Sequence, residues 1–385
     1  MSGAKILTNP HCAQTSSEDG IVFSASADPP GARGTATGIV DTRLVAIERW
    51  LDTQPGLQRA PGETAAAYSL SPASADASFR RYFRARYADG QSSIVMDAPP
   101  DKEDCRPFVH VAALLRKAGL HAPEILAQDL DQGFLLLSDL GTQTYLDVLT
   151  GPSATEAHTA SLFADATEAL VRWQLASREN DLPPYDDALL RREMNLFPEW
   201  YVGRHLGRTL TTAQRDALET VFAQLVASAL AQPRVYVHRD FMPRNLMVST
   251  PNPGILDFQD AVYGPITYDA VSLWRDAFIS WDEERVLDGC ARYWSRARQA
   301  SLPVHPDFAE FYRQFEWMGL QRHLKVLGIF ARLTHRDGKE KYVADSPRFV
   351  RYARAVAERY SALAPLARLL DELEGAVPKR TGLTF

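Results

Sequence analysis

The pattern of apolar and polar positions changes twice along the chain. Residues 1–41 are rich in Ser, Ala, Gly, Thr and Pro without sustained periodicity, which is typical of a disordered tail. Apolar residues then recur at helical spacing up to Leu51, with Asp41 or Thr42 as the expected helix cap. We therefore predict that ordered structure begins near residue 42.

A pattern typical of strands follows this first helix. Residues 79–87 and 93–96 are β-prone and are separated by a turn at Ala88-Asp89-Gly90. A helix is expected over about residues 106–118, closed by Gly119. Two further β-prone runs, at residues 124–129 and 133–138, predict a second hairpin. These elements predict a small mixed sheet with one helix, ending near Ser138.

After residue 141 the pattern becomes mainly helical. The helices are expected at about residues 142–150, 155–178, 187–206, 211–231, 266–279, 283–299, 307–333 and 349–373. The change predicts two lobes, an N-terminal nucleotide-binding lobe at 42–138 and a C-terminal catalytic and substrate lobe at 139–385. A nucleotide is expected in the cleft between the lobes, because inter-lobe crevices are common ligand sites.

Composition supports an ordinary globular protein and narrows the function. The 385 residues are 45% hydrophobic and 23% charged, which suits two lobes. The net charge of -6 gives no general attraction to nucleic acid or to an anionic membrane. No run of about 18 apolar residues predicts a membrane span, and the start lacks the apolar segment of a secretory signal. The three distant cysteines predict reduced thiols in a cytoplasmic protein without a metal site. No obligate protein partner is inferred from the sequence.

The candidate chemistry is concentrated in residues 235–248, where an apolar run, a charged loop and a second apolar run follow one another. The loop holds His238, Asp240 and Asn245 with the spacing H-x-D-x-x-x-x-N, and Asp257 follows a further apolar run. Phosphoryl transfer from ATP needs a carboxylate for the attacking hydroxyl and hard oxygen ligands for Mg²⁺. The spacing therefore favours Asp240 as the catalytic base and Asn245 with Asp257 as metal ligands.

Two features of this motif leave room for another interpretation. Protein kinases carry an Asp-Phe-Gly triplet at the second ligand, whereas the third position here is Gln259. Asp and Asn are also common turn residues, so a simple β-hairpin with a polar tip would give a similar pattern. The further apolar run that ends in Asp257 favours the kinase-like site over the hairpin.

The phosphate clamp of protein kinases is not obvious in this chain. Those enzymes use a glycine-rich loop and a lysine on the third strand. The corresponding residues 74–82 contain no glycine, and residues 94–97 contain no lysine. The small residue Ser78 could still approach phosphates, and Arg80 or Lys102 could supply charge. The alternatives are a solvated arginine and a surface lysine.

Strand alternation and neighbouring acids limit these choices. Arg80 and Arg81 should point to opposite faces, so at most one of them would face a cleft. Glu103 or Asp104 could pair with Lys102, although either acid would equally suit the start of a helix.

Four further residues are candidates for the acceptor side. Glu193 and Asn195 lie on a predicted helix and could bind a polyhydroxy substrate, unless that helix simply packs in the core with its polar side in water. Asp260 could bind a sugar hydroxyl, support the metal or act as a turn residue. Arg244 could face the transferred phosphate or lie on the surface.

Two residues are expected to support the loop without chemistry of their own. Asp269 should open or anchor a helix beneath the catalytic loop. His238 should hold the loop backbone through hydrogen bonds. Phe258, next to the second metal ligand, is expected to pack in the core.

The motif at 238–245, the Leu-Asp-Phe at 256–258 and the later Gly-Pro-x-x-Tyr-Asp at 264–269 resemble the aminoglycoside phosphotransferase/choline kinase family. The segments at 96–104, 134–141, 193–197 and 258–265 resemble the anomeric N-acetylmuramate/N-acetylglucosamine kinases of bacterial peptidoglycan recycling. This resemblance implies an α+β, bilobal protein-kinase-like fold with a small mixed-sheet N-lobe and a larger, mainly helical C-lobe. The ATP-binding residues expected with it are Ser78, Arg80, Met96, Lys102, Ser138, Asp139 and Leu140.

The resemblance implies an enzyme that uses ATP and Mg²⁺ to phosphorylate the anomeric hydroxyl of an amino sugar. Asp240 would accept the hydroxyl proton, and positioning with charge neutralisation would supply most of the rate. Two alternatives remain open at this point. One is a kinase of another hydroxylated small molecule, such as an aminoglycoside or an amino alcohol. The other is a nucleotide-binding pseudokinase, which the missing glycines and lysine favour and the Asp240/Asn245/Asp257 set opposes.

Overall fold

The computed structural model describes residues 41–55, 57, 67–75, 79–152 and 154–374. The predicted N-terminal tail up to residue 40 lies outside these residues, as does Ser78. The described chain divides into two compact units. The first, here called the sheet unit, contains the described residues up to 169 together with 243–260. The second, the helical unit, contains 170–242 and 261–374. The functional division after Ser138 stays a prediction.

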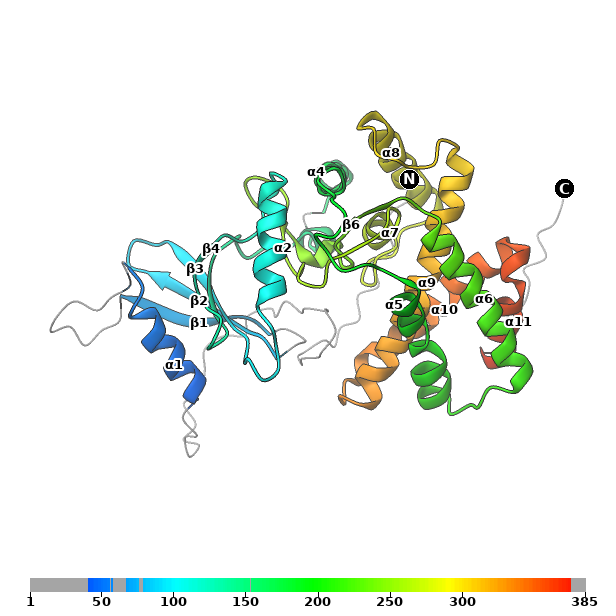
Figure 1. Ribbon diagram of the computed structural model, residues 1–385, viewed down its shortest axis with the longest axis horizontal. Helices are drawn as coiled ribbons and strands as arrows, with labels where there is room; N and C mark the ends of the chain where they lie inside the picture. Colours follow the sequence, from blue (N-terminus) through cyan, green and yellow to red (C-terminus); the bar gives the residue numbers. More distant parts are fainter. Residues whose placement is uncertain (1–40, 56, 58–66, 76–78, 153, 375–385) are drawn as a thin grey trace. The chain divides into compact units, whose positions relative to one another are not determined.

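A five-stranded sheet forms the centre of the sheet unit (Figure 1). Its strands are β1 (Tyr68–Ala75), β2 (Arg81–Tyr87), β3 (Ser92–Asp97), β4 (Ile125–Asp129) and β5 (Phe134–Ser138), in the spatial order β1-β2-β3-β5-β4. All four pairings are antiparallel, where the sequence predicted a mixed sheet. The two predicted hairpins are present, and β1 is an additional edge strand that the apolar pattern did not indicate.

Helix α1 (Thr42–Leu51) covers one face of this sheet. Asp41 caps it by accepting hydrogen bonds from the backbone N–H groups of Arg43 and Leu44, as the sequence predicted. The helical stripe packs against alternate residues of the strands, since successive strand side chains point to opposite faces. The buried cluster contains Ile47, Trp50, Leu51, Ala85, Val95, Phe134 and Leu136.

The rest of the sheet unit includes two helices and the short elements around Asn245 and Asp257. They are α2 (Arg106–Lys117), α3 (Tyr145–Thr150), the 3₁₀ turn η2 (Pro243–Asn245), β7 (Leu246–Met247) and β8 (Gly254–Ile255). Phe258 is buried, with its ring centroid 4.7 Å from that of Phe108 on α2. This contact confirms the core position predicted for Phe258.

The helical unit is assembled around α9 (Phe308–His335), a 28-residue helix that is buried along most of its length. Figure 1 shows α5, α6 and α10 beside it. The other elements are α5 (Asp187–Met194), η1 (Phe197–His205), α6 (Thr212–Leu230), β6 (Arg234–Val237), β9 (Val262–Pro265), α7 (Tyr268–Trp274), α8 (Glu283–Gln299), η3 (Glu340–Asp345), α10 (Ser346–Arg359), η4 (Ser361–Leu363) and α11 (Ala364–Glu374). Helix α4 (Glu156–Leu175) begins in the sheet unit and ends in the helical unit.

Two helices predicted as continuous are interrupted, so those expectations were wrong. The helix expected at 187–206 ends at Met194 and resumes as the wider π-helical turns of η1, with Pro198 in the first turn. The helix expected at 349–373 stops at Arg359, because Tyr360 takes extended backbone angles. Proline lacks the N–H that a helix interior needs but is tolerated in a first turn, which explains the new start at η1. Helix α7 is also shorter than the predicted 266–279.

Candidate active site

The catalytic loop follows the buried strand β6. The two strands that flank the loop do not pair with each other. β6 pairs with β9, whereas β7, on the far side of the loop, pairs with β8. The hairpin interpretation of residues 235–248 is therefore wrong. The loop instead runs from the helical unit, which contains Asp240, into the sheet unit, which contains Asn245.

Asp269 lies under the start of this loop, in the first turn of α7. Its fully buried carboxylate accepts hydrogen bonds from the backbone N–H of His238 at 2.7 Å and of Arg239 at 3.0 Å. Burial raises the pKa of Asp269 to about 7, and the two N–H donors offset only part of that effect. This geometry suits the supporting role predicted for Asp269.

The backbone immediately before Asp240 has an unusual conformation. Arg239 has φ of 74°, in the left-handed region that a residue with a Cβ rarely adopts. The backbone N–H of Asp240 donates to Nδ1 of His238 at 3.3 Å, which is the kind of loop contact predicted for that histidine. The turn at Arg239 is thus bonded on both sides.

Asp240 itself is accessible, since its side chain is 17% exposed. A cation adjoins it, because Nη1 of Arg322 on α9 lies 3.6 Å from Oδ1 of Asp240. Arg322 also donates to the carbonyl oxygen of Arg239 at 3.1 Å. A reachable carboxylate held beside a fixed cation can orient a hydroxyl group and accept its proton.

The two predicted metal ligands lie together in the sheet unit. Nδ2 of Asn245 is 3.2 Å from Oδ2 of Asp257, and the other oxygen of Asp257 accepts from Nε2 of Gln259 at 2.9 Å. Asp257 has φ of 62°, so it stands on a turn after β8 and not within the strand expected there. An amide and a carboxylate side by side fit Mg²⁺, which prefers oxygen ligands and keeps several waters.

A buried ion pair occupies the region where the phosphate clamp was expected. Nη2 of Arg80 lies 3.2 Å from Oε2 of Glu103, and both side chains are largely buried. Lys102 instead is half exposed and lies 3.7 Å from Asp101, so its expected pairing with Glu103 or Asp104 was wrong. Lys102 and Glu103 are adjacent in the sequence, but their side chains have different partners. Glu103 pairs with Arg80.

Arg81 is separated from Arg80 as strand alternation predicted. It contacts Asp97 at 2.6 Å and Asp41 at 2.5 Å, and it belongs to the edge of the α1-covered face.

Asp139 lies directly after β5, and hydrogen bonds fix its side chain. Its carboxylate accepts from Nε of Arg84 at 2.6 Å, from Oγ of Ser92 at 2.7 Å and from the N–H of Gly141 at 3.0 Å. Burial would raise the pKa of Asp139, but the hydrogen bonds and the Arg84 charge lower it below its usual value. The carboxylate is therefore a structural anion in this structure.

Three other residues expected to bind ATP have partners or neighbours within the protein. Met96 and Leu140 are buried. Oγ of Ser138 accepts from the N–H of Glu124, and the N–H of Ser138 donates to the Glu124 carbonyl.

Glu193 is placed differently from the substrate contact that the sequence predicted. It is 4% exposed at the end of α5. Its Oε1 contacts Nη2 of Arg239 at 2.5 Å and Nζ of Lys325 at 2.9 Å. Its Oε2 accepts from the hydroxyl of Tyr185 and from Nε2 of Gln321 at 3.1 Å. Both oxygens are thus engaged within the protein.

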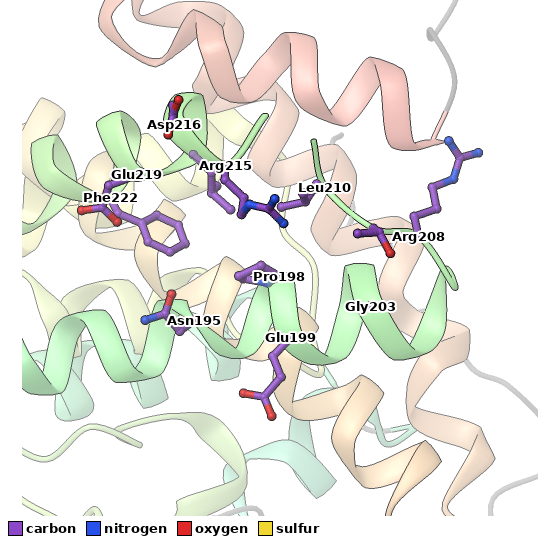
Figure 2. Close-up of a pocket in the computed structure, with 12 residues that line it drawn as sticks. Asn195, Pro198, Glu199, Gly203, Arg208, Leu210, Arg215, Asp216, Glu219 and Phe222 are labelled. Carbon is purple, nitrogen blue, oxygen red and sulfur yellow. The ribbon is translucent and has the colours of Figure 1, made fainter. Parts of the chain in front are cut away.

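Asn195 lies in a different environment, although it is only two residues further along. It lines an open pocket of about 540 Å³ between η1 and α6, together with Pro198 and Phe222 (Figure 2). The structure therefore does not bring Glu193 and Asn195 together. Of the other two acceptor-side candidates, Arg244 is buried in η2 and Asp260 is exposed.

Three polar residues of α9 escaped the sequence analysis, which predicted only the helix. Gln321, Arg322 and Lys325 are all buried and contact the loop or its support. A signal was present, because charged residues within an otherwise apolar helical stretch are expected to be paired when buried. The apolar pattern alone does not say with which partner.

The described residues hold no other obvious centre. Among them, no three His, Cys, Asp or Glu side chains form a metal-binding group, and no helix is long and apolar enough to cross a membrane. Cys105 and Cys290 are buried free thiols, and Cys12 lies outside the described part of the chain.

Comparison with known proteins shows the family and the fold of this chain. The phosphotransferase enzyme family (APH) matches residues 69–310. A curated N-acetylmuramate/N-acetylglucosamine kinase from Pseudomonas putida is 55% identical over 337 residues, covering 87% of this chain and 97% of the relative. One of the same name from Pseudomonas aeruginosa is 54% identical and covers 86% and 97%. A choline/ethanolamine kinase family protein from Mesorhizobium loti has a TM-score of 0.53 at 17% identity, over 85% of this chain and 100% of that one. These likenesses confirm the predicted kinase-like fold.

Proposed function

This chain belongs to the phosphotransferase enzyme family, and we propose that it transfers the terminal phosphoryl group of ATP to the anomeric hydroxyl of N-acetylmuramate, N-acetylglucosamine or both. Relatives that are 54–55% identical along almost their whole length carry the name of that kinase. The product would be a sugar 1-phosphate for cell-wall recycling. ATP as the donor favours a cytoplasmic enzyme that needs no nucleic acid, membrane or obligate protein partner.

The observation that carries the proposal is the arrangement of the catalytic motif. Asp240 is partly exposed and adjoins a fixed cation, while Asn245 and Asp257 stand side by side five and seventeen residues further on. We assign Asp240 to orient the anomeric hydroxyl and to accept its proton. We assign Asn245 and Asp257 to hold Mg²⁺. When bound, that ion would neutralise charge on the ATP phosphates.

The Arg80–Glu103 pair is our candidate for the missing phosphate clamp. Protein kinases hold their phosphate-binding lysine with a glutamate, and here a largely buried arginine at the start of β2 is held by Glu103 in the same manner. A guanidinium presents a planar set of donors that suits phosphate oxygens. Lys102 is exposed and would add charge only at the rim.

The acceptor side rests on fewer observations. Asp260 is exposed at the end of the sheet unit and remains our candidate for a sugar hydroxyl. Arg244 is buried three residues after Phe241 and remains a candidate for the transferred phosphate. The engagement of Glu193 within the protein argues against direct contact with the sugar.

Phosphorus-31 NMR of the purified protein with Mg²⁺-ATP and each sugar separately tests the proposal. We expect a new sugar 1-phosphate resonance that is lost in Asp240→Asn. ADP formation without that resonance would indicate another acceptor, such as an aminoglycoside or an amino alcohol. Nucleotide binding without any turnover would support the pseudokinase alternative. An Asp240→Asn variant with wild-type turnover would overturn the assignment of the base.

A further inference from the structure

The residue between His238 and Asp240 carries the least favourable backbone conformation of the loop. A left-handed conformation costs a residue with a Cβ about 1 kcal/mol or more, so the surrounding structure must impose it. Such conformations tend to occur where the chain must aim a functional side chain. Asp240, the proposed base, is the next residue.

The backbone N–H, the carbonyl oxygen and the guanidinium of Arg239 each have a partner in the helical unit. Its N–H donates to Asp269, and its carbonyl oxygen accepts from Arg322 and, at 3.3 Å, from Oγ of Ser272. Its guanidinium contacts Glu193. The backbone contacts come from α7 and α9, whereas the side-chain contact comes from α5.

Glu193 has several partners besides Arg239. Lys325 supplies a second cation, and Tyr185 and Gln321 supply neutral donors. Burial would raise the pKa of Glu193, but Lys325 and Arg239 lower it well below its usual value. The carboxylate is therefore a permanent buried anion whose geometry is set from three sides.

We propose that Glu193 is a positioning residue that acts on Asp240 through Arg239: its carboxylate holds the Arg239 side chain and so maintains the left-handed turn that aims the base. This inference rests on the proposed role of Asp240. It assigns to Glu193 a task in the transfer step, in place of the sugar contact that its sequence context suggested. A displacement of about 1 Å in a catalytic group can cost ~100-fold in rate.

A double-mutant cycle in kcat tests the proposal, with Glu193→Gln, Arg239→Gln and the double variant. We expect each single change to lower kcat by about 10- to 100-fold, with KM for the sugar and for Mg²⁺-ATP within about threefold of wild type. We expect the double variant to be no slower than the slower single variant, because both changes remove the same contact.

Three results would overturn the proposal. They are wild-type kcat in Glu193→Gln, multiplication of the two losses in the double variant, and a rise of about tenfold or more in sugar KM at unchanged kcat. The last result would restore Glu193 as a substrate contact. Glu358→Gln, which alters an exposed carboxylate on α10, is the matched control and should behave as wild type.

Two further measures keep the test decisive. Glu193→Gln leaves two buried cations against a neutral amide, so its fold is checked by circular dichroism. If it does not fold, Arg239→Gln alone still decides the matter, because Lys325 continues to neutralise Glu193 there. Asp240→Asn serves as the reference: if it retains wild-type turnover, the proposed base is wrong, whereas if it is inactive and both single variants match wild type, only the positioning role fails.

Discussion

Two buried carboxylates support the same loop, and their surroundings drive their pKa values in opposite directions. Glu193 is held by two cations, and its pKa is lowered. Asp269 is held mainly by two backbone N–H groups, and its pKa rises to about 7. Both side chains are almost completely buried. In this protein the two cations beside Glu193 outweigh the effect of burial on its pKa, whereas the backbone N–H donors at Asp269 do not.

The two contacts also differ in what they hold. Asp269 bonds the backbone at the end of β6 and so orders the chain regardless of the residue types in the loop. Glu193 bonds a side chain and depends on Arg239 being present. We therefore expect Asp269 to matter for the path of the loop and Glu193 to matter for the aim of Asp240.

The largest effect on stability is expected from Glu193→Ala. It leaves Arg239 and Lys325 buried without their anion, which should lower the free energy of unfolding by about 3–5 kcal/mol. Urea denaturation followed by circular dichroism measures this loss. The double variant Glu193→Ala/Lys325→Met should recover part of it, because one buried charge is removed. A loss below about 1 kcal/mol would mean that water replaces the carboxylate.

Asp269→Ala should cost less, about 2–3 kcal/mol. Two buried N–H groups lose their acceptor, but unlike Glu193→Ala the change leaves no pair of buried cations without their anion. Asp269→Asn keeps one acceptor oxygen and should lose about half as much. The same urea titrations measure these changes, and a larger loss for Asp269→Ala than for Glu193→Ala would reverse the ranking.

The pH dependence of stability should distinguish the two carboxylates further. Because folding raises the pKa of Asp269, the folded state binds a proton that the unfolded state has released between about pH 4 and pH 7. The stabilisation is therefore complete below pH 4 and is lost as the pH rises through 7, with a slope of at most about 1.4 kcal/mol per pH unit.

This slope is isolated by subtracting the unfolding free energy of Asp269→Asn from that of wild type at each pH. The subtraction removes the opposite contribution of the histidines whose pKa values are lowered, His205 and His323. The corresponding difference for Glu193→Gln should be flat between pH 5 and 7, because Glu193 stays ionised there. A flat difference for Asp269→Asn would show that its carboxylate is ionised throughout.

The smallest effect on stability is expected from breaking a solvent-exposed ion pair. Asp288 and Arg292 on α8 contact each other at 2.8 Å with most of both side chains exposed. Asp288→Ala should change the unfolding free energy by less than about 0.5 kcal/mol, because water already solvates both charges. Raising the salt concentration should abolish even that difference. A loss above 1 kcal/mol would show that burial is not what separates Glu193 from ordinary pairs.

The sequence predicted the parts of the site that lie close together along the chain. The cap at Asp41, the two hairpins and the motif from His238 to Asn245 all depend on residues that are close together in the sequence. Local rules on caps, alternation and motif spacing are sufficient there. The same rules could not foresee the interruption at Tyr360, because competing helical and extended conformations differ by little until the chain packs.

The partners of Glu193 could not be predicted from local sequence patterns. The sequence indicated a helix with a polar residue, which is compatible with a substrate contact or with a solvated surface. The cations that pair with its buried carboxylate are 46 residues away at Arg239 and 132 residues away at Lys325. No spacing rule links such distant positions.

By itself, the sequence determined that this chain has a kinase-like motif, a strand-rich region followed by a helical region, and three oxygen-bearing side chains suited to phosphoryl transfer. The tertiary structure decided that Asp257 stands on a left-handed turn beside Asn245. It also decided that Glu103 pairs with Arg80 and not with Lys102, and that Glu193 is buried. The physical reason is burial. A charge removed from water must find a partner wherever the fold provides one, and only long-range packing determines which partner that is.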